Sequence, residues 1–402
     1  MLKIIVVMNN IKGKKLLVQG AGRGNLGLVK AAVANGVETY IAGMDGDYPC
    51  KPLATKVCFA DITDPDAVLE VARANKVDGA AICCIDTGLR GVGRCCDALG
   101  LTGVSEEAAM CSNNKSLMKE KLVAAGVRTA AYFKIHSKAE LDEAVASIGY
   151  PVIIKATDLQ GSRGISIVRS AETLDAAFAD TMSLTRKDYC IVEEFIVGRE
   201  YGAQSFIYNG EVLFVLPHGD ETMMSKTAVP VGHYMPYEMS EPLREDTEVQ
   251  VKKAIKALGF DNCAVNVDLI ERDGKAYIIE LGARVGANAL PELTGNYFGV
   301  NYYEMILTMA LGGNPIEIFE KRTAPCATLA RMIRFDKNGV VKSVSVPELP
   351  DTEIHMFVKE GSEVRAFTNC NDAVGEIIVK GATLEECETK ITEANNGIVI
   401  EI

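Results

Sequence analysis

The stretch Ala264-Val-Asn-Val-Asp268-Leu-Ile-Glu-Arg-Asp-Gly-Lys-Ala-Tyr-Ile-Ile-Glu280-Leu-Gly-Ala-Arg284 contains two runs of strand-forming residues. They flank Arg272-Asp273-Gly274, and an Asp-Gly pair between alternating apolar runs is a strong signal for a β-hairpin. We therefore predict two antiparallel strands joined by a short loop.

Side chains alternate between the two faces of such a hairpin. One predicted face is apolar and packs, with Val265, Val267, Leu269, Tyr277, Ile279 and Leu281. The other face carries Asn266, Asp268, Ile270, Ile278 and Glu280, and Arg284 follows at its end. If the loop has three residues, Glu280 lies opposite Asn266 and diagonal to Asp268, about 7–8 Å away at the backbone.

Two acids on one half-buried face repel each other and resist desolvation unless a cation lies between them. A carboxylate pair suits Mg²⁺, which binds through one or two carboxylates together with waters and substrate phosphates. An exposed edge hairpin with solvated acids is the alternative. The hairpin alone does not distinguish between the two interpretations.

Composition limits the classes of protein that the chain can belong to. Its 402 residues leave room for two or three domains. The net charge of -12 and the pI near 5.1 argue against a protein that binds the phosphate backbone of nucleic acids.

No apolar run approaches the ~18 residues of a membrane span, and residues 1–10 lack a signal-peptide pattern. The twelve cysteines form no C-x-x-C pattern and are typical of reduced core residues, so we expect a cytoplasmic protein.

The N-terminal part alternates strands and helices. Lys15 to Gln19 is a predicted buried strand, followed by a glycine loop, a helix to Asn35 and a second strand that ends before Asp45. Gly22, Gly24 and Gly27 match the G-x-G-x-x-G pattern of a nicotinamide or flavin site, with Asp45 near the position of the ribose acid. A tight strand-to-helix turn needs the same glycines for close packing. The alternation continues to about residue 112 and predicts a doubly wound α/β domain.

Three later segments fit a nucleotide phosphate site. Lys115 begins a predicted helix, Lys155 ends a strand that starts at Pro151, and Gly161-Ser162-Arg163-Gly164 lies in the loop before the strand 165–168. Backbone N–H groups of a glycine-bearing loop, together with a lysine on the adjoining strand, can bind phosphate oxygens. A plain hairpin tip with a surface lysine is the alternative.

The segment Tyr189 to Glu200 is an apolar strand that ends in Glu193 and Glu194, turns at Gly198 and reaches a third acid, Glu200. This arrangement fits a hinge whose backbone meets adenine while Glu200 meets the ribose hydroxyls. Surface acids at a strand end are the alternative.

The next stretch begins with strands 201–208 and 211–216, which we expect to pair across Asn209-Gly210. The acid-rich stretch 218–248 is predicted to be irregular and to form part of the substrate pockets, with Lys226 and His233 as candidate substrate or phosphate contacts. A helix is expected from Thr247 to Leu258.

The order of these parts resembles the ATP-grasp superfamily, which includes D-alanine ligase, biotin carboxylase and carbamoyl phosphate synthase. The motifs that carry the resemblance are K-x₅-G-S-x-G from Lys155, E-E-F-I-x-G-x-E from Glu193, and the acidic hairpin. The resemblance implies a Rossmann-like pre-ATP-grasp domain at 1–112 and a two-subdomain ATP-grasp fold at 113–320, with a small lid subdomain at about 125–195. A small α+β capping domain would occupy 321–402.

The resemblance also assigns roles by position. Lys115 and Lys155 would hold the ATP phosphates under a lid of Gly161, Ser162 and Gly164. Glu193, Glu194 and Ile196 would form the adenine hinge and Glu200 would hold the ribose. Asp268 and Glu280 would bind two Mg²⁺ or Mn²⁺ ions, and Arg284 would face the transferred phosphoryl group.

Gly282 stands where the family usually has a third metal ligand, an Asn, so Asn266 or Asn288 is expected to substitute. Arg331 is expected to reach the site from the C-terminal domain, and the N-terminal glycine loop would form a wall on the substrate side.

These roles imply an ATP-dependent carboxylate–amine ligase that forms an acyl phosphate and releases ADP and phosphate. Such a reaction needs positioning and charge neutralisation rather than a nucleophilic side chain. An ATP-dependent bicarbonate-activating carboxylase, a carbamoyl-phosphate-synthase-like enzyme, a nicotinamide-binding oxidoreductase and a non-catalytic nucleotide-binding regulator are the alternatives. The expected partners are small carboxylates and amines, without nucleic acid or membrane, and relatives are compatible with a homodimer.

Overall fold

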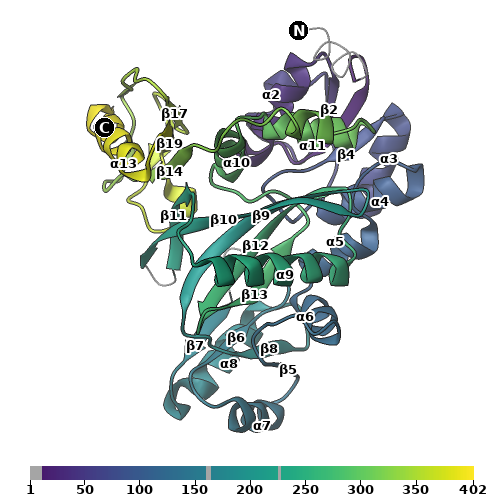
Figure 1. The fold of residues 1–402 in the computed structure, drawn as a ribbon, viewed down its shortest axis with the longest axis vertical. Helices are drawn as coiled ribbons and strands as arrows, with labels where there is room; N and C mark the ends of the chain where they lie inside the picture. Colours follow the sequence, from purple (N-terminus) through teal and green to yellow (C-terminus); the bar gives the residue numbers. More distant parts are fainter. Residues whose placement is uncertain (1–10, 160–163, 225–227) are drawn as a thin grey trace.

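The structure is a computed structural model that describes residues 11–159, 164–224 and 228–402. Figure 1 shows a large sheet across the middle, a small sheet with its helices below it, and N-terminal and C-terminal domains above it on opposite sides. The predicted α/β architecture is confirmed.

The N-terminal domain is a four-stranded parallel sheet with strand order β3-β2-β1-β4. Its strands are β1 (Lys15–Gln19), β2 (Glu38–Gly43), β3 (Lys56–Phe59) and β4 (Gly79–Ala81). The helices that follow are α2 (Leu26–Ala34), α3 (Pro65–Asn75), α4 (Leu89–Leu99), α5 (Glu106–Asn113) and α6 (Lys115–Ala124). Leu16 and Val18 of β1 pack with α2 and with α11 (Tyr302–Ala310), whereas Leu17 packs with α3 and α4. Helices therefore cover both faces, as a doubly wound sheet requires.

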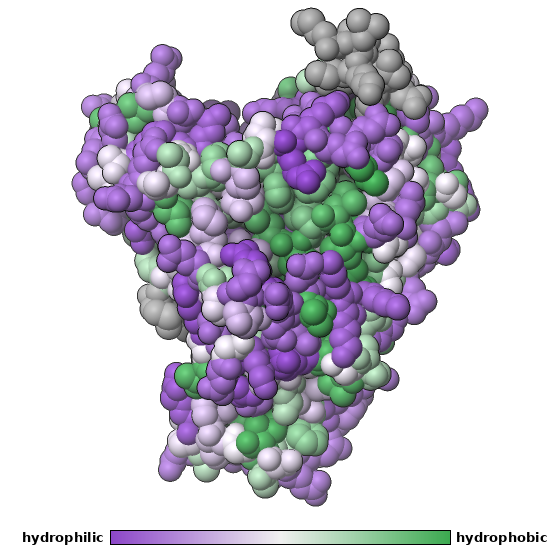
Figure 2. All heavy atoms as spheres, in the orientation of Figure 1, coloured by the Kyte–Doolittle hydropathy of each residue, from purple (hydrophilic) through white to green (hydrophobic). Residues whose placement is uncertain are grey.

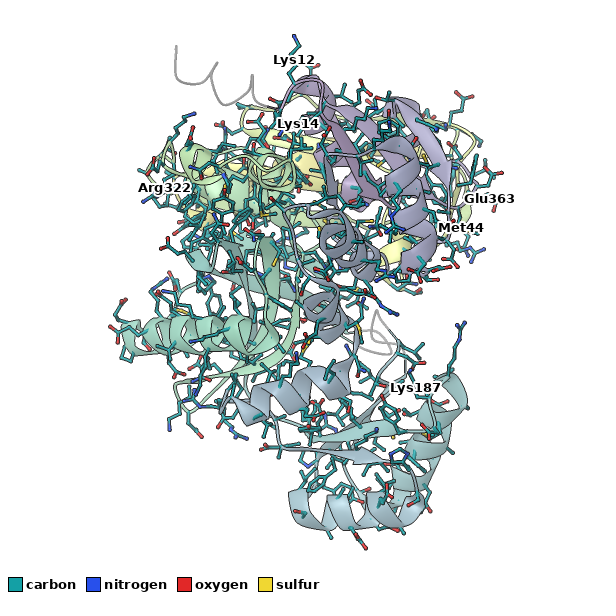
Figure 3. All side chains as sticks on the ribbon, turned by 90° about the vertical axis from the view of Figure 1, so that its right-hand side faces the viewer. Lys12, Lys14, Met44, Lys187, Arg322 and Glu363 are labelled. Atoms are coloured by element: carbon teal, nitrogen blue, oxygen red, sulfur yellow. The ribbon has the colours of Figure 1, made fainter. Side chains whose placement is uncertain are left out.

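The small sheet has the order β5-β8-β6-β7 and is antiparallel throughout. It consists of β5 (Tyr132–Ile135), β6 (Val152–Lys155), β7 (Ile165–Val168) and β8 (Cys190–Glu194), with α7 (Lys138–Ile148) and α8 (Leu174–Leu184) packed on one side. This unit, which we call the lid subdomain, lies at the bottom of Figure 1. In Figure 3, Lys187 lies at the edge of the lid subdomain that faces the N-terminal domain.

The large sheet has eight strands in the order β13-β12-β9-β10-β11-β14-β19-β17. Its strands are β9 (Arg199–Tyr208), β10 (Glu211–Met224), β11 (Ala228–Met235), β12 (Cys263–Arg272), β13 (Lys275–Gly282), β14 (Ala327–Ile333), β17 (Thr352–Met356) and β19 (Gly375–Gly381). Helix α9 (Glu241–Leu258) packs on one face, against Val265, Val267 and Leu269. Helices α10 (Leu290–Phe298) and α11 pack on parts of the opposite face, where Phe206 and Leu216 lie.

The prediction that residues 218–248 are irregular is wrong. The second half of β10 and all of β11 lie inside the large sheet, between β9 and β14. Polar side chains at His218, Asp220 and Glu221, together with a register shift after Glu221, hide the alternation that normally signals a strand. Helix α9 also begins at Glu241, earlier than the predicted Thr247.

The C-terminal domain shares its sheet with the ATP-grasp part of the chain, because β14 pairs with β11 and then with β19. Helix α13 (Leu384–Gly397) packs against β14 and β19. Shorter elements complete this region: α12 (Ile316–Phe319), the pair β15 (Gly339–Val340) and β18 (Glu363–Val364), and the pair β16 (Ser343–Ser345) and β20 (Val399–Glu401).

Figure 2 shows apolar side chains gathered below α11, where that helix meets the large sheet, and a notch between the N-terminal and C-terminal domains. In the parts of the chain that the structure describes, no helix combines the length and apolar character needed to cross a membrane.

Candidate active site

The hairpin of β12 and β13 brings its two acids into direct opposition. Arg272 pairs with Lys275, so the loop is the two-residue turn Asp273-Gly274, with φ of 55° and 71°. The three-residue loop on which the expected pairing depended is therefore not found. A register shift follows at Asp268/Leu269, and Asp268 then pairs directly with Glu280. The predicted pairing of Glu280 with Asn266 is also wrong, and the two carboxylates lie closer than expected.

The extra residue at this shift is Ile279, which makes a β-bulge. Because of it, Ile278 lies on the core face with Leu269 and is fully buried, whereas Tyr277 shares the acidic face with Ile270. The predicted faces of Tyr277 and Ile278 were therefore interchanged. We call the surface that carries Asn266, Asp268, Ile270 and Glu280 the site face.

The electrostatics of the site face favour a bound cation. Desolvation by the surrounding protein, together with the negative charges of Glu280 and Asp220, raises the pKa of Asp268 to about 6. Two opposed carboxylates are hard oxygen donors of the kind that Mg²⁺ and Mn²⁺ bind. The donor set therefore fits a divalent ion held by Asp268 and Glu280.

Lys115, the first residue of α6, contacts this acid pair. Its Nζ donates to Oε1 of Glu280 at 2.6 Å. Burial acts against the charged ammonium, but Glu280 outweighs it and the pKa of Lys115 is raised. The structure thus places the lysine expected at the phosphates beside the acid expected at the metal.

Lys155 lies at the end of β6 and contacts Glu193. The two are joined at 2.9 Å, and Lys119 of α6 lies 3.3 Å from the same carboxylate oxygen. All three side chains are buried. Burial would raise the pKa of Glu193, but the two lysines hold it below its ordinary value. Lys119 was not recognised from the sequence, where it is one of several lysines in a helix.

The predicted hinge is placed in part. Glu193 lies inside β8, paired on both sides, and its carboxylate is held by Lys155 and Lys119. Glu194 forms an ion pair with Arg272, and Ile196 is buried. Glu200 pairs with Ile270 on the site face and is exposed, in line with a role at the ribose.

Arg284 is held by a carboxylate from the N-terminal domain. Its Nε and Nη2 donate to the two oxygens of Asp86, each at 2.7 Å. Burial opposes the charge, but Asp86 outweighs it and the pKa of Arg284 is raised. A Cβ on Gly282 would lie 3.0 Å from Oδ1 of Asp86, so the glycine leaves room for this pair. Asp86 follows β4, at the strand-end edge where doubly wound sheets bind ligands, and this signal could have found it.

Asn266 lies beside Asp268 on the site face, but its oxygen is occupied. Its Oδ1 accepts from Nε2 of Gln204 at 2.6 Å, and its Nδ2 donates to Oδ1 of Asp268 at 3.0 Å. In this orientation it supports Asp268 rather than offering a metal ligand.

Arg331 lies away from the site face, since its neighbour Ala330 pairs with His233 while Arg331 binds Glu221 and Glu388. The expectation that Arg331 reaches the site is therefore wrong.

Part of the predicted phosphate loop falls outside the described residues, namely Gly161 and Ser162, as does Lys226. Gly164 is described: its φ is +66°, and its carbonyl accepts from the N–H of Ala156 at 2.8 Å. It closes the loop at the base of the β6–β7 hairpin, next to Lys155.

Two of the three glycines in the N-terminal loop have a packing explanation. A Cβ on Gly27 would lie 2.2 Å from the ring of Tyr303, and a Cβ on Gly24 would lie 2.7 Å from Cys84. Asp45 is almost fully exposed and pairs with Lys51. Close packing therefore accounts for Gly24 and Gly27 of the pattern that suggested a nicotinamide or flavin site, whereas a Cβ on Gly22 would meet no atom within 4 Å.

Comparisons with known proteins agree with this geometry. Residues 148–292 match the family model of the ATP-grasp domain, and residues 331–402 match the L-amino acid ligase C-terminal domain 2. A crystal structure of phosphoribosylglycinamide synthetase from Anaerococcus prevotii is 46% identical, with a TM-score of 0.87, over 97% of this chain and 100% of that one. An L-amino acid ligase from Bacillus licheniformis shares the fold, with a TM-score of 0.80 at 19% identity over 97% and 99% of the two chains.

Among curated proteins, the alanine–anticapsin ligase of Bacillus subtilis is 25% identical over 66% of this chain. The match spans 64% of that ligase's own length. None of these proteins is named as an oxidoreductase. The acid pair, the flanking lysines and the near-complete match to a synthetase of the same fold show that this chain belongs to the ATP-grasp superfamily, among its carboxylate–amine ligases.

Proposed function

We propose that the chain catalyses an ATP-dependent ligation of a carboxylate to an amine, with an acyl phosphate as intermediate and ADP and phosphate as products. The observation that carries this proposal is the direct opposition of Asp268 and Glu280, with Lys115 bound to one of them. Phosphoryl transfer depends mainly on positioning and charge neutralisation, and this set supplies both.

Asp268 and Glu280 would hold one or two divalent ions, Mg²⁺ or Mn²⁺, which would neutralise charge on the transferred phosphoryl group. Lys155 and Lys115 add positive charge from the lid subdomain and from α6. Arg284, fixed by Asp86, would face the phosphoryl group. The site thus combines cations from three parts of the chain.

The names of the relatives support an amino acid as one substrate. One relative is named for joining alanine to anticapsin, another for joining phosphoribosylamine to glycine, and the C-terminal family model is that of L-amino acid ligases. We therefore propose an amino acid as the carboxylate that is activated. A homodimer is the assembly we expect, and light scattering would test it.

The test is to incubate the protein with Mg-ATP and each of the twenty L-amino acids and to measure ADP. We expect ADP and an amide product, and AMP with pyrophosphate would contradict the mechanism. Glu280→Ala should lower turnover at least about 100-fold and weaken metal-dependent nucleotide binding, because it removes half of the acid pair. Glu271→Ala, on the same hairpin but near its turn, is the control and should retain activity.

A further inference from the structure

A second polar group lies on the site face, two strands away from Asp268. Asp268 pairs with Gly202 of β9, and Gly202 pairs in turn with His218 of β10. A Cβ on Gly202 would lie 2.2 Å from Cε1 of His218, so the imidazole occupies the space above this glycine. His218 therefore shares the site face with the acid pair, at a backbone separation of two strand spacings, about 10 Å.

The hydrogen bonds around Gln204 fix the protons on His218. The N–H of Gly286 donates to Oε1 of Gln204 at 3.0 Å, so Nε2 of Gln204 is the donor end. This amide group faces both Oδ1 of Asn266, at 2.6 Å, and Nε2 of His218, at 3.2 Å. Nε2 of His218 is thus an acceptor, and its Nδ1–H donates to Oδ1 of Asp220 at 2.9 Å.

Asp220 accepts from a second imidazole as well. Nδ1 of His233 lies 2.6 Å from the same oxygen, Oδ1. Burial would raise the pKa of Asp220, but His218 and His233 outweigh it and hold the pKa well below its usual range. Since Asp220 is a carboxylate, His233 donates from Nδ1, and a lone pair remains on its Nε2 in the neutral ring.

That lone pair has no partner. His233 is 5% exposed, and its Nε2 is buried without a hydrogen bond to any residue that the structure describes. Leaving a buried acceptor unsatisfied costs about 1–3 kcal/mol, so such a group indicates a ligand or a reacting proton. Asp220 holding Nδ1–H while Nε2 stays free is the arrangement of an oriented general base.

A metal ion is the competing occupant. One ligand atom from each of His218, Asp220 and His233 can be chosen so that all three lie within 4.8 Å of one another. However, both Nδ1 atoms point at one carboxylate oxygen, and the hydrogen bond from Gln204 requires a proton on Nδ1 of His218. A cation between them would need lone pairs where the network places protons. The geometry favours a proton acceptor.

We propose that His233 accepts the proton released when the amine attacks the acyl phosphate, a step that rests on the proposed ligase function. The amine nitrogen forms a bond to the acyl carbon, the bond from that carbon to the phosphate oxygen breaks, and phosphate leaves with the electron pair. One N–H proton passes to Nε2 of His233. Asp220 is a positioning residue. Hydrogen bonds through His218 and Gln204 link it to Asn266, and so to the acid pair.

The experiment separates the two half-reactions by changing the nucleophile. The full chain is given Mg-ATP, each of the twenty L-amino acids as the acid, and either hydroxylamine or amino-acid amines as the nucleophile. Hydroxylamine is neutral near pH 7 and traps the acyl phosphate with little need for a base. The variants are His233→Gln, Asp220→Asn and, as the control, His136→Gln, whose imidazole lies on the lid subdomain and is about half exposed.

His233→Gln should keep the rate of hydroxamate formation within about threefold and lower the rate of amide formation by about 100-fold or more. Asp220→Asn should show the same selective loss, and His136→Gln should show none. Imidazole added to His233→Ala should restore part of the amide rate alone, which keeps the test informative if His233→Gln folds poorly.

Two results would overturn the role of His233: an equal loss of hydroxamate and amide formation in His233→Gln, or calorimetric binding of Zn²⁺ to the wild type that His233→Gln abolishes. A wild type that releases no ADP with any acid would instead reject the ligase function, and the role of His233 with it.

Discussion

At the scale of single residues, Arg284 depends on a carboxylate from another domain. Arg284 and Asp86 are 15% and 19% exposed and form two hydrogen bonds. Asp86→Asn should lower the free energy of unfolding by about 2 kcal/mol, since the guanidinium loses its charged partner. It should also lower ADP release, because Arg284 is no longer held in place.

Chemical denaturation and the ADP assay would check both effects. Asp66→Asn is the matched control, since Asp66 pairs with Arg94 in the same domain but is 74% exposed. An exposed pair contributes little, so this variant should behave as the wild type. Equal effects of the two substitutions would contradict the assignment.

A second residue-scale prediction concerns Glu193, whose buried carboxylate neutralises Lys155 and Lys119. Glu193→Gln leaves two buried lysines together without an acid and should cost about 3–5 kcal/mol of stability. It should also weaken ATP binding, because Lys155 loses the group that positions it. Calorimetry of nucleotide binding and thermal unfolding would measure these effects.

Glu194→Gln is the neighbouring control for this prediction. Glu194 is 31% exposed and pairs with Arg272 near the surface. We expect a much smaller loss of stability there. If Glu193→Gln bound ATP as tightly as the wild type, Glu193 would have no role in positioning Lys155.

At the scale of elements, the bulge at Ile279 decides which face Glu280 occupies. Before the shift the hairpin pairs Leu269 with Ile278, and after it Asp268 pairs with Glu280. Inserting one alanine after Ile279 should pair the alanine with Asp268 and move Glu280 opposite Val267, on the face covered by α9, because a slip of one residue exchanges the faces of a strand. Burying a carboxylate there should cost several kcal/mol and abolish ADP release.

Ile279→Ala is the comparison, since it keeps the residue count and therefore the register. It should retain ADP release with a smaller loss of stability. Melting temperature and ADP release, measured for both variants, would test the role of the bulge. Full activity in the insertion variant would show that the strand realigns in another way.

The elements themselves differ in how far the sequence reveals them. Helix α7 has local signals at both ends, because Ser137 caps its start and Gly149 ends it. The second half of β10 and all of β11 were missed, since their polar residues face both sides of the sheet. The acid pair and Lys115 were predicted, whereas the bulge, Asp86 and the pairing of Asp220 with two histidines depend on contacts between distant segments.

At the scale of the whole molecule, stability should depend on pH through His355. This imidazole lies between Glu353 and Glu376 on the edge of the large sheet, and the two carboxylates, against the effect of burial, raise its pKa from 6.5 to about 10. A raised pKa means that the protonated form stabilises the fold. The contribution is complete below pH 6.5 and is lost as the pH rises through 10.

His355→Gln should therefore reduce the loss of stability between pH 6.5 and pH 10. Urea unfolding of the wild type and the variant across this range would measure the difference. His136→Gln, on the lid subdomain, should follow the wild type. Parallel curves for wild type and His355→Gln would show that the two carboxylates do not hold the imidazole charged.

The pairing of β11 with β14 also bears on how this protein can be divided or recombined. A chain shortened to end near residue 320 would expose residues 232–235 of β11 as an open edge, and such edges recruit other chains into aggregates. The border that looks natural for exchanging C-terminal modules between relatives is therefore a poor place to cut. A working chimera would have to import β11 together with the strands that it supports.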